Sequence, residues 1–175
     1  MKIRRATLKD APAIAAIHVR AWQAAYAQIL PAGYLAGLSE PEKTIFWQQQ
    51  LAVDRGAILV AVSGGRVVGW ASGGASRDAD ARGESEVYAI YVAPEFWRRG
   101  LGRQLMEKTE AAISPCPSFT LWVLRQNERA IGFYRKMGYE FDGAEKSVLI
   151  GGGDLPEVRL RKRTRIAHEQ DGPAP

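Results

Sequence analysis

The sequence predicts an α/β (α+β) fold in which helices flank a central mixed β-sheet. Apolar residues follow helical spacing up to about residue 52 and β-rich runs from residue 57 onward. Beyond residue 85, strand-like and helix-like patterns alternate, which is typical of helices packed on one sheet. A length of 175 residues suits one domain. We expect that domain over residues 1–163, followed by a flexible tail over 164–175 that lacks an apolar pattern.

The first third of the chain predicts one strand and three helices. KIRRAT at the N-terminus suits a short edge strand. Thr7 or Asp10 is the expected cap of a long helix over residues 11–30, with Pro12 in its first turn. Pro31 separates this helix from a second helical segment. Ser39 opens a third helix that ends near residues 54–56.

The remainder predicts strands joined by tight turns and two helices. Residues 57–63 and 66–72 form a hairpin around Gly64-Gly65, and a loop follows over 73–85. The run EVYAIYV, apolar on both faces after its first residue, predicts a central strand. The later elements are a helix over 102–113, a strand over 119–124, a helix over 127–137 capped by Asn127 and ended by Gly138, and strands over 146–151 and 156–162.

Charge and composition narrow the class of protein. The net charge of +5 is compatible with nucleic acid, an acidic substrate or a phosphate-bearing cofactor. One basic cluster comprises Arg98, Arg99 and Arg103. A second alternates with apolar residues, which predicts a solvated strand face; its members are Arg159, Arg161, Lys162, Arg163 and Arg165. No apolar run is long enough to cross a bilayer, so no membrane attachment is expected. Cys116 is the one cysteine of the sequence, which indicates a reducing compartment such as the cytoplasm.

The segment PEFWRRGLGRQLM places two arginines and a Gly-x-Gly turn directly before a helix. A helix N-terminus exposes unpaired N–H groups and a partial positive charge, and Gly100 and Gly102 let a ligand approach them closely. We interpret the segment as a cradle for a pyrophosphate. A Walker loop is absent, and Leu105 occupies the third glycine position of a dinucleotide fingerprint. The alternative is a basic helix start with packing glycines and no ligand.

Two segments resemble the GNAT superfamily of N-acetyltransferases. VYAIYVAPEFWRRGLGRQLM is similar to its acetyl-coenzyme A (acetyl-CoA) segment, [Q/R]-x-x-G-x-[G/A], and NERAIGFYRKMGYE is similar to its later N-x-x-A-x-x-F-Y motif. The expected element order also matches the GNAT acyl-CoA N-acyltransferase fold. One departure is Trp97, which stands where the family usually has glutamine or arginine.

The resemblance implies a set of residues that bind acetyl-CoA. Backbone groups of Ile90, Tyr91 and Val92 would pair with the pantetheine arm as an added strand does. The N–H groups that would hold the pyrophosphate come from Arg98, Arg99, Gly100, Leu101, Gly102 and Arg103. Asn127 would bond the pantetheine or act as a plain helix cap, and both roles are compatible.

Acetyl transfer to an amine requires a base, a donor to the thioester oxygen and a proton for the leaving thiolate. We nominate Glu86 as the base, acting through a water, and Glu84 as the second candidate. The alternative role of Glu86 is that of a carboxylate at a strand end that pairs with an arginine. A main-chain N–H near Val92 would serve the oxygen. Tyr134, near the sulfur, would supply the proton, and its alternative role is core packing. No metal site is expected, and a nucleophilic Cys116 with His18 or His168 is unattractive.

The acceptor is predicted to be a small-molecule or peptide amine opposite the cofactor. Trp22, Tyr26 and Tyr34 are candidate wall residues, with core packing as the alternative for each. Their segment resembles a W-x-x-x-Y-x-x-I-L-P run of a GNAT subgroup that includes polyamine acetyltransferases. Other functions left open are a non-catalytic CoA-binding regulator and, less favoured, a nucleic-acid binder using VRLRKR. Analogy with the family leaves a homodimer open.

Overall fold

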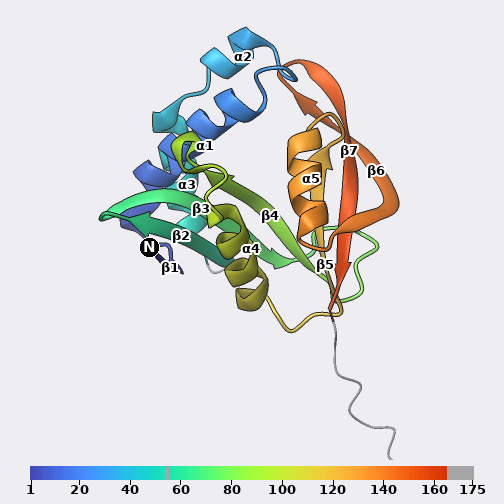
Figure 1. The fold of residues 1–175 in the computed structure, drawn as a ribbon. Coiled ribbons are helices and arrows are strands. Elements are labelled where there is room, and N and C mark those ends of the chain that lie inside the picture. The colour runs from blue at the N-terminus through green and yellow to red at the C-terminus, as the bar shows by residue number, and fades with distance from the viewer. Residues whose placement is uncertain (54–55, 165–175) are drawn as a thin grey trace, which may run out of the picture.

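A seven-stranded sheet forms the centre of the computed structural model, which describes residues 1–53 and 56–164 (Figure 1). The strand order within these residues is β1-β2-β3-β4-β5-β7-β6. The strands are β1 (Lys2–Arg5), β2 (Ala57–Ser63), β3 (Arg66–Ala75), β4 (Ser85–Val92), β5 (Ser118–Leu124), β6 (Glu140–Ile150) and β7 (Gly153–Arg163). The helices are α1 (Ala11–Ala25), α2 (Ala32–Ala36), α3 (Glu40–Leu51), α4 (Leu101–Ala112) and α5 (Glu128–Lys136). The predicted mixed sheet with flanking helices is confirmed.

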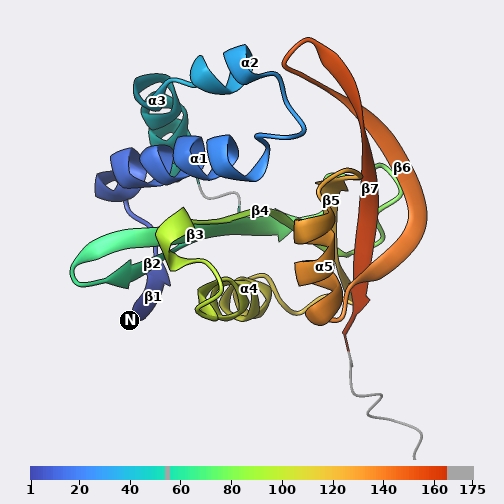
Figure 2. The same cartoon turned by 45° about the horizontal axis from the view of Figure 1, so that its top comes forward.

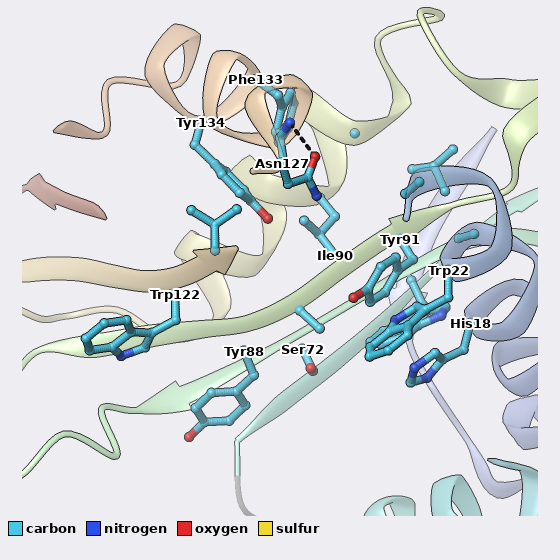
Figure 3. Close-up of a pocket in the computed structure, with 18 of the residues that line it drawn as sticks. His18, Trp22, Ser72, Tyr88, Ile90, Tyr91, Trp122, Asn127, Phe133 and Tyr134 are labelled. Atoms are coloured by element: carbon cyan, nitrogen blue, oxygen red, sulfur yellow. Dashed lines mark hydrogen bonds between the residues drawn. The ribbon is translucent and has the colours of Figure 1, made fainter. Parts of the chain in front are cut away.

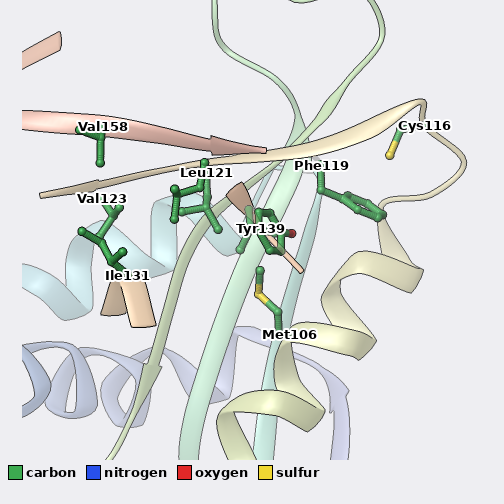
Figure 4. Packing of buried hydrophobic residues seen from close by; sticks show 10 residues of the cluster. Met106, Cys116, Phe119, Leu121, Val123, Ile131, Tyr139 and Val158 are labelled. Atoms are coloured by element: carbon green, nitrogen blue, oxygen red, sulfur yellow. The ribbon is translucent and has the colours of Figure 1, made fainter. Parts of the chain in front are cut away.

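The helices cover the sheet in separate layers (Figure 2). In that view α1, α2 and α3 lie above the β1–β4 half of the sheet and α4 lies below it. The helix α5 packs against the β5–β7 half, where Ile131 joins Leu121, Val123 and Val158 in a buried cluster (Figure 4). No helix in the described part of the chain is long and apolar enough to cross a membrane.

Local signals placed most helix ends correctly. Asp10 is the residue before α1 and forms an ion pair with Arg4 at 2.7 Å, which lowers the pKa of its carboxyl to about 2. The Oγ of Ser39 accepts from the N–H of Glu42 at the start of α3. Gly138 follows α5 with φ of +88°, a conformation that favours glycine.

Several predicted boundaries were wrong. The third helix ends at Leu51 rather than near 54–56, and the last strand begins at Gly153 rather than 156. Three further differences have identifiable causes. The first helix ends at Ala25 rather than 30, because the carbonyl of Tyr26 accepts from both Ile29 and Leu30 in a turn. β3 runs on through residues 73–75, which the sequence assigned to a loop on account of their glycines. β6 begins at Glu140 rather than Lys146, since an edge strand exposed along most of its length shows no apolar alternation.

β4 and β5 run parallel and separate almost as soon as they pair. Only Ser85 with Phe119 and Glu86 with Thr120 are matched between them. On the other side of β4, Tyr88 has no opposite residue on β3, since Gly73 pairs with Val87 and Ser72 with Ala89. One extra residue on a strand is a β-bulge, which bends the strand and increases its twist. The bend leads β4 away from β5 and leaves an open edge.

The basic C-terminal strand is not the freely solvated face that the sequence predicted. Arg159 is buried and paired with Asp78, Asp80 and Asp142. Arg161 is paired with Glu84 and Asp142, and Lys162 with Glu110. The carboxylates come from β6, α4 and the β3–β4 loop, distant in sequence, so the local pattern could not reveal them. Arg165 and the tail beyond it lie outside the described residues.

Gly73, beside the bulge, is a position where the addition of one methyl group should destabilise the fold. A Cβ at Gly73 would lie 2.8 Å from the carbonyl oxygen of Glu86 and 2.9 Å from the Ile113 side chain. We expect Gly73→Ala to lower the free energy of unfolding by about 1–3 kcal/mol in urea titrations. Gly132→Ala, in α5 with open space around the new methyl, is the matched control and should be neutral or stabilising by about 0.5–1 kcal/mol. Equal effects of the two substitutions would contradict this packing.

Candidate active site

The opening between β4 and β5 continues into a cleft of about 960 Å³ (Figure 3). Its walls come from both halves of the sheet, from α1 and α3, and from the starts of α4 and α5. The structure gathers most residues that the sequence singled out along this cleft, namely Trp22, Tyr26, Ile90, Tyr91, Val92, Arg98, Gly100, Gly102, Arg103, Asn127 and Tyr134. Tyr34, Glu84, Glu86, Arg99 and Leu101 are not among its lining residues.

The free edge of β4 presents backbone groups to the cleft. The N–H of Ala93 donates to the carbonyl of Val68, so at Ala93 the backbone faces β3. Backbone direction alternates along a strand, which turns Ile90 and Val92 toward the cleft and Tyr91 toward β3. Of the three residues expected to pair with an extended ligand, two therefore point the correct way. Tyr91 differs and brings its side chain to the cleft instead.

The basic end of the cleft lies where two helices begin. Gly100 precedes α4 with φ of +76°, and Arg98 has φ of +60°, an uncommon conformation for a residue with a side chain. Such turns direct successive N–H groups into one concavity that suits an anion. The cations that line this end are Arg98, Arg103 and Arg129, of which Arg103 is also paired with Glu107 at 2.8 Å. Their mutual repulsion is relieved when an anion binds among them.

Trp97 has a role that the family pattern did not predict. Its Nε1 donates to the carbonyl oxygen of Val92 at 2.7 Å, and the guanidinium of Arg129 lies 3.6 Å from its ring centroid. Burial, together with the charge of Arg98, lowers the pKa of Arg129. Arg129 was missed in the sequence, although a cation in the first turn of a helix opposes the helix dipole and is itself a signal.

Three tyrosines meet near the middle of the cleft. The hydroxyls of Tyr26 and Tyr91 lie 3.4 Å apart, and the hydroxyl of Tyr134 points into the same space (Figure 3). Burial raises the pKa of all three, so they stay protonated near neutral pH. Asn127 lies beside them and caps α5, its Oδ1 accepting from the N–H of Ala130 at 3.1 Å. The predicted cap is confirmed.

Glu86 lies at the end of the cleft behind Arg77. It is 1% exposed, and it accepts from the N–H of Arg77 at 3.0 Å and from its Nε at 3.1 Å, with a further contact to Nη2. The arginine pairing that the sequence left open as the alternative is thus present. Glu84 is likewise engaged, with Arg161. Arg77 itself lines the cleft, and no local motif indicated it.

Aromatic rings form the wall at the end opposite the arginines. His18, Trp22 and Tyr26 follow one another at helical spacing along α1, with ring centroids 5.4 and 5.0 Å apart. His18 also stacks on Tyr91 at 5.5 Å. Trp47 and Trp70 complete the wall, and sequence reasoning missed both because they come from other elements. Tyr34 lies instead against Gly151 in the β6–β7 turn.

His18 is neutral in this wall. Burial, with a contribution from Lys43, lowers its pKa to about 4. Its Nδ1 accepts from the indole of Trp47 at 3.3 Å, so the hydrogen resides on Nε2. Within the described chain, Nε2 of His18 and Nε1 of Trp22 are buried without a hydrogen-bond partner. Buried donors of this kind normally find a partner, so a ligand atom is the expected one.

Comparison with known proteins agrees with this geometry. The family model described as "Acetyltransferase (GNAT) family" matches residues 19–139. The chain is 34% identical over 160 residues to an uncharacterized N-acetyltransferase, YuaI, of Bacillus subtilis, covering 90% of each chain. It is 28% identical to a probable N-acetyltransferase, Rv2775, of Mycobacterium tuberculosis, covering 92% of each.

A solved structure shares the fold across nearly the whole chain. It is yncA of Salmonella typhimurium, a putative acetyltransferase with its cofactor acetyl-CoA. The TM-score is 0.70 at 22% identity, covering 99% of this chain and 98% of the other. This likeness supports the sheet and helix arrangement described above.

The buried neutral histidine predicts a specific dependence of stability on pH. Because the folded-state pKa lies below the ordinary value of 6.5, the unfolded chain binds the proton more readily. Stability is therefore complete above pH 6.5 and falls toward pH 4, by up to about 1.4 kcal/mol per pH unit. Urea unfolding of His18→Phe should show a flatter profile over this window. A wild-type profile that parallels the variant would contradict the assignment.

Proposed function

The chain belongs to the GNAT acetyltransferase family, and from this premise we propose that it moves the acetyl group of acetyl-CoA directly to a primary amine of a small molecule or peptide. The observation that carries the proposal is the separation of β4 from β5 beside the start of α4. That arrangement offers a strand edge and an anion site along one continuous cleft.

The cleft fits coenzyme A part by part. The backbone edge at Ile90 and Val92 suits the amide groups of pantetheine, which bind as an added strand would. The N–H groups between Arg98 and Arg103 suit the diphosphate, as the turn and the helix dipole both favour negative charge. Arg129, close to Arg98, adds charge for the remaining phosphate. A Cβ at Gly102 would lie 3.5 Å from the Phe133 ring, so Phe133 packs directly beside this turn.

The residues at the centre of the cleft serve the transfer itself. Acetyl-CoA supplies the acetyl group as an activated thioester. The N–H of Val92 donates to the thioester oxygen, and Tyr134 delivers its proton to the departing sulfur. Direct transfer in a ternary complex is favoured because Cys116 is buried in the core and absent from the cleft lining. His168, its other potential partner, lies outside the described residues.

Glu86 acts on the cleft through Arg77 in our proposal. Its carboxylate is covered by that arginine, which fixes the guanidinium in the cleft wall. Activation of the amine by Glu86 through a water remains a hypothesis that requires Arg77 to move. Since Glu86 lies at the start of β4 and is bonded to Arg77, an ion pair explains its position without a role as base.

Two further functions are distinguished by experiment. A CoA-binding regulator would bind acetyl-CoA without turnover, whereas Tyr134 and the open acceptor half of the cleft favour catalysis. A nucleic-acid binder would need free cations, yet Arg159, Arg161 and Lys162 are paired with carboxylates. The deciding test is release of thiol from acetyl-CoA across a panel of amines, amino acids, polyamines and peptides. No release with any acceptor would favour the regulator. A cytoplasmic location, a single domain over 1–163 and a homodimer stay predictions.

Loss of the Tyr134 hydroxyl should slow turnover while leaving cofactor binding intact. We expect Tyr134→Phe to lower kcat by about 10²-fold, the range of general acid catalysis, with the Kd for CoA within twofold of wild type. Tyr34→Phe, outside the cleft lining, is the control. Unchanged kcat in Tyr134→Phe would remove Tyr134 from the mechanism.

Removal of one arginine at the anion site should weaken CoA binding. Arg98→Asn deletes the guanidinium and keeps a residue that tolerates positive φ. Loss of a charge-assisted contact worth about 1.5 kcal/mol or more raises the Kd at least tenfold. Calorimetric titration with CoA measures it, and Arg135→Asn, whose side chain lies over Phe141, is the control. Equal affinity of both variants would argue against the diphosphate site.

A further inference from the structure

Glu157 is an acidic residue of the cleft that the mechanism above does not use. It lies in β7, opposite Leu124 of β5 and Lys146 of β6. Its side chain is 17% exposed and lines the cleft. Within the described residues the only other acidic lining residue is Glu128, in the first turn of α5.

Among the described residues, the charge of Glu157 is compensated only at a distance, by Lys146 and by the charge of Arg77. In the described chain the cation paired with it is Lys146, whose Nζ is 3.7 Å away, beyond hydrogen-bond distance. That ammonium also lies 4.0 Å from the Trp122 ring centroid. Buried carboxylates elsewhere in the fold are bonded directly, as Glu86 is by Arg77 and Glu110 by Lys162. A partly buried carboxylate without such a partner is arranged to receive a cation.

Glu157 stands at the end of the aromatic wall. Glu157 and Tyr26 line the same cleft, and the charge of Glu157 is the smallest contribution to the raised pKa of Tyr26, after burial and the hydrogen bonds of its hydroxyl. From Tyr26 the wall continues through Trp22 to His18. Burial raises the pKa of Glu157, as expected for a carboxylate held away from water. The cleft thus offers an acid at one point and aromatic faces extending from it.

We propose, on the basis of the acetyl transfer proposed above, that Glu157 binds the ammonium of the acceptor and takes up its proton, and that the acceptor is a monoamine with an aromatic body. The ammonium R–NH₃⁺ gives one proton to the Glu157 carboxylate and becomes R–NH₂. The amine nitrogen then forms its bond to the acetyl carbon as the carbon–sulfur bond breaks. The second nitrogen proton leaves to water, and Tyr134 protonates the sulfur. Water then returns a proton to Tyr134 and takes the proton held by Glu157, which restores both side chains.

The composition of the cleft favours a monoamine over other amines. A polyamine needs a second acid, and the other acidic lining residue, Glu128, lies in the first turn of α5 next to Arg129, whereas the α1 side of the cleft carries the aromatic rings and the neutral His18. An amino acid needs a cation for its carboxylate, and Arg77 is already committed to Glu86. An aromatic body satisfies the wall, and an oxygen on its ring satisfies the unpartnered donors of His18 and Trp22.

The test uses the full chain saturated with CoA for calorimetric titration of tyramine, and with acetyl-CoA for initial rates. We expect Glu157→Gln to raise both the Kd and the KM for tyramine at least tenfold and to lower kcat at saturating tyramine at least tenfold. Glu157→Asp should recover part of both losses. Glu140→Gln, an exposed glutamate on β6 outside the cleft lining, should match wild type. Relative to tyramine, L-tyrosine and 1,4-diaminobutane should show kcat/KM at least tenfold lower.

The outcomes separate this inference from the function on which it rests. Thiol release by wild type with KM and kcat unchanged in Glu157→Gln overturns the role of Glu157 and leaves acetyl transfer standing. Absence of thiol release with every amine overturns the transferase proposal, while tyramine binding that depends on Glu157 still supports the ammonium site. Equal or better use of the diamine or the amino acid overturns the aromatic monoamine class.

Discussion

The separation of β4 from β5 is the constraint on which the rest of the site depends. The two strands share only two residue pairs, and the bulge at Tyr88 bends β4 away from its neighbour. A sheet that opens in this way leaves backbone N–H and C=O groups without a strand partner inside the molecule, which is costly unless something else bonds them. The indole of Trp97 takes the carbonyl of Val92, and an extended ligand with its own amides is the natural partner for the remaining edge.

Charge is distributed along the cleft in a way that matches two different ligands. At the start of α4 and α5, Arg98 and Arg129 lie close together, and the helix dipoles add to their positive charge. At the opposite end the side chains are aromatic or neutral, and the one nearby acid, Glu157, has a distant partner. By contrast, Arg159, Arg161 and Lys162 of β7, which lie outside the cleft lining, are each paired with a carboxylate. Unbalanced charge therefore occurs where a ligand is expected.

Local sequence signals predicted the helices and strands and many of the residues that line the cleft. Caps at Ser39 and Asn127, the Gly64-Gly65 turn and the apolar run of β4 each depend on neighbouring residues alone, so they could be recognised without the fold. The same holds for the glycine-opened start of α4. What the sequence could not reveal are pairings across the fold, such as Arg77 with Glu86 and Arg129 with Trp97, and the aromatic wall shared by α1, α3 and β3. The sequence did not single out Glu157, because only the opening of the sheet makes it a cleft residue.

A crystal structure of the protein with coenzyme A tests the central claim most directly. The account predicts pantetheine amides bonded to the backbone of Ile90 and Val92, the diphosphate on the N–H groups between Arg98 and Arg103, and the sulfur beside Tyr134. Coenzyme A bound elsewhere, with the gap between β4 and β5 closed or filled by protein side chains, would contradict it.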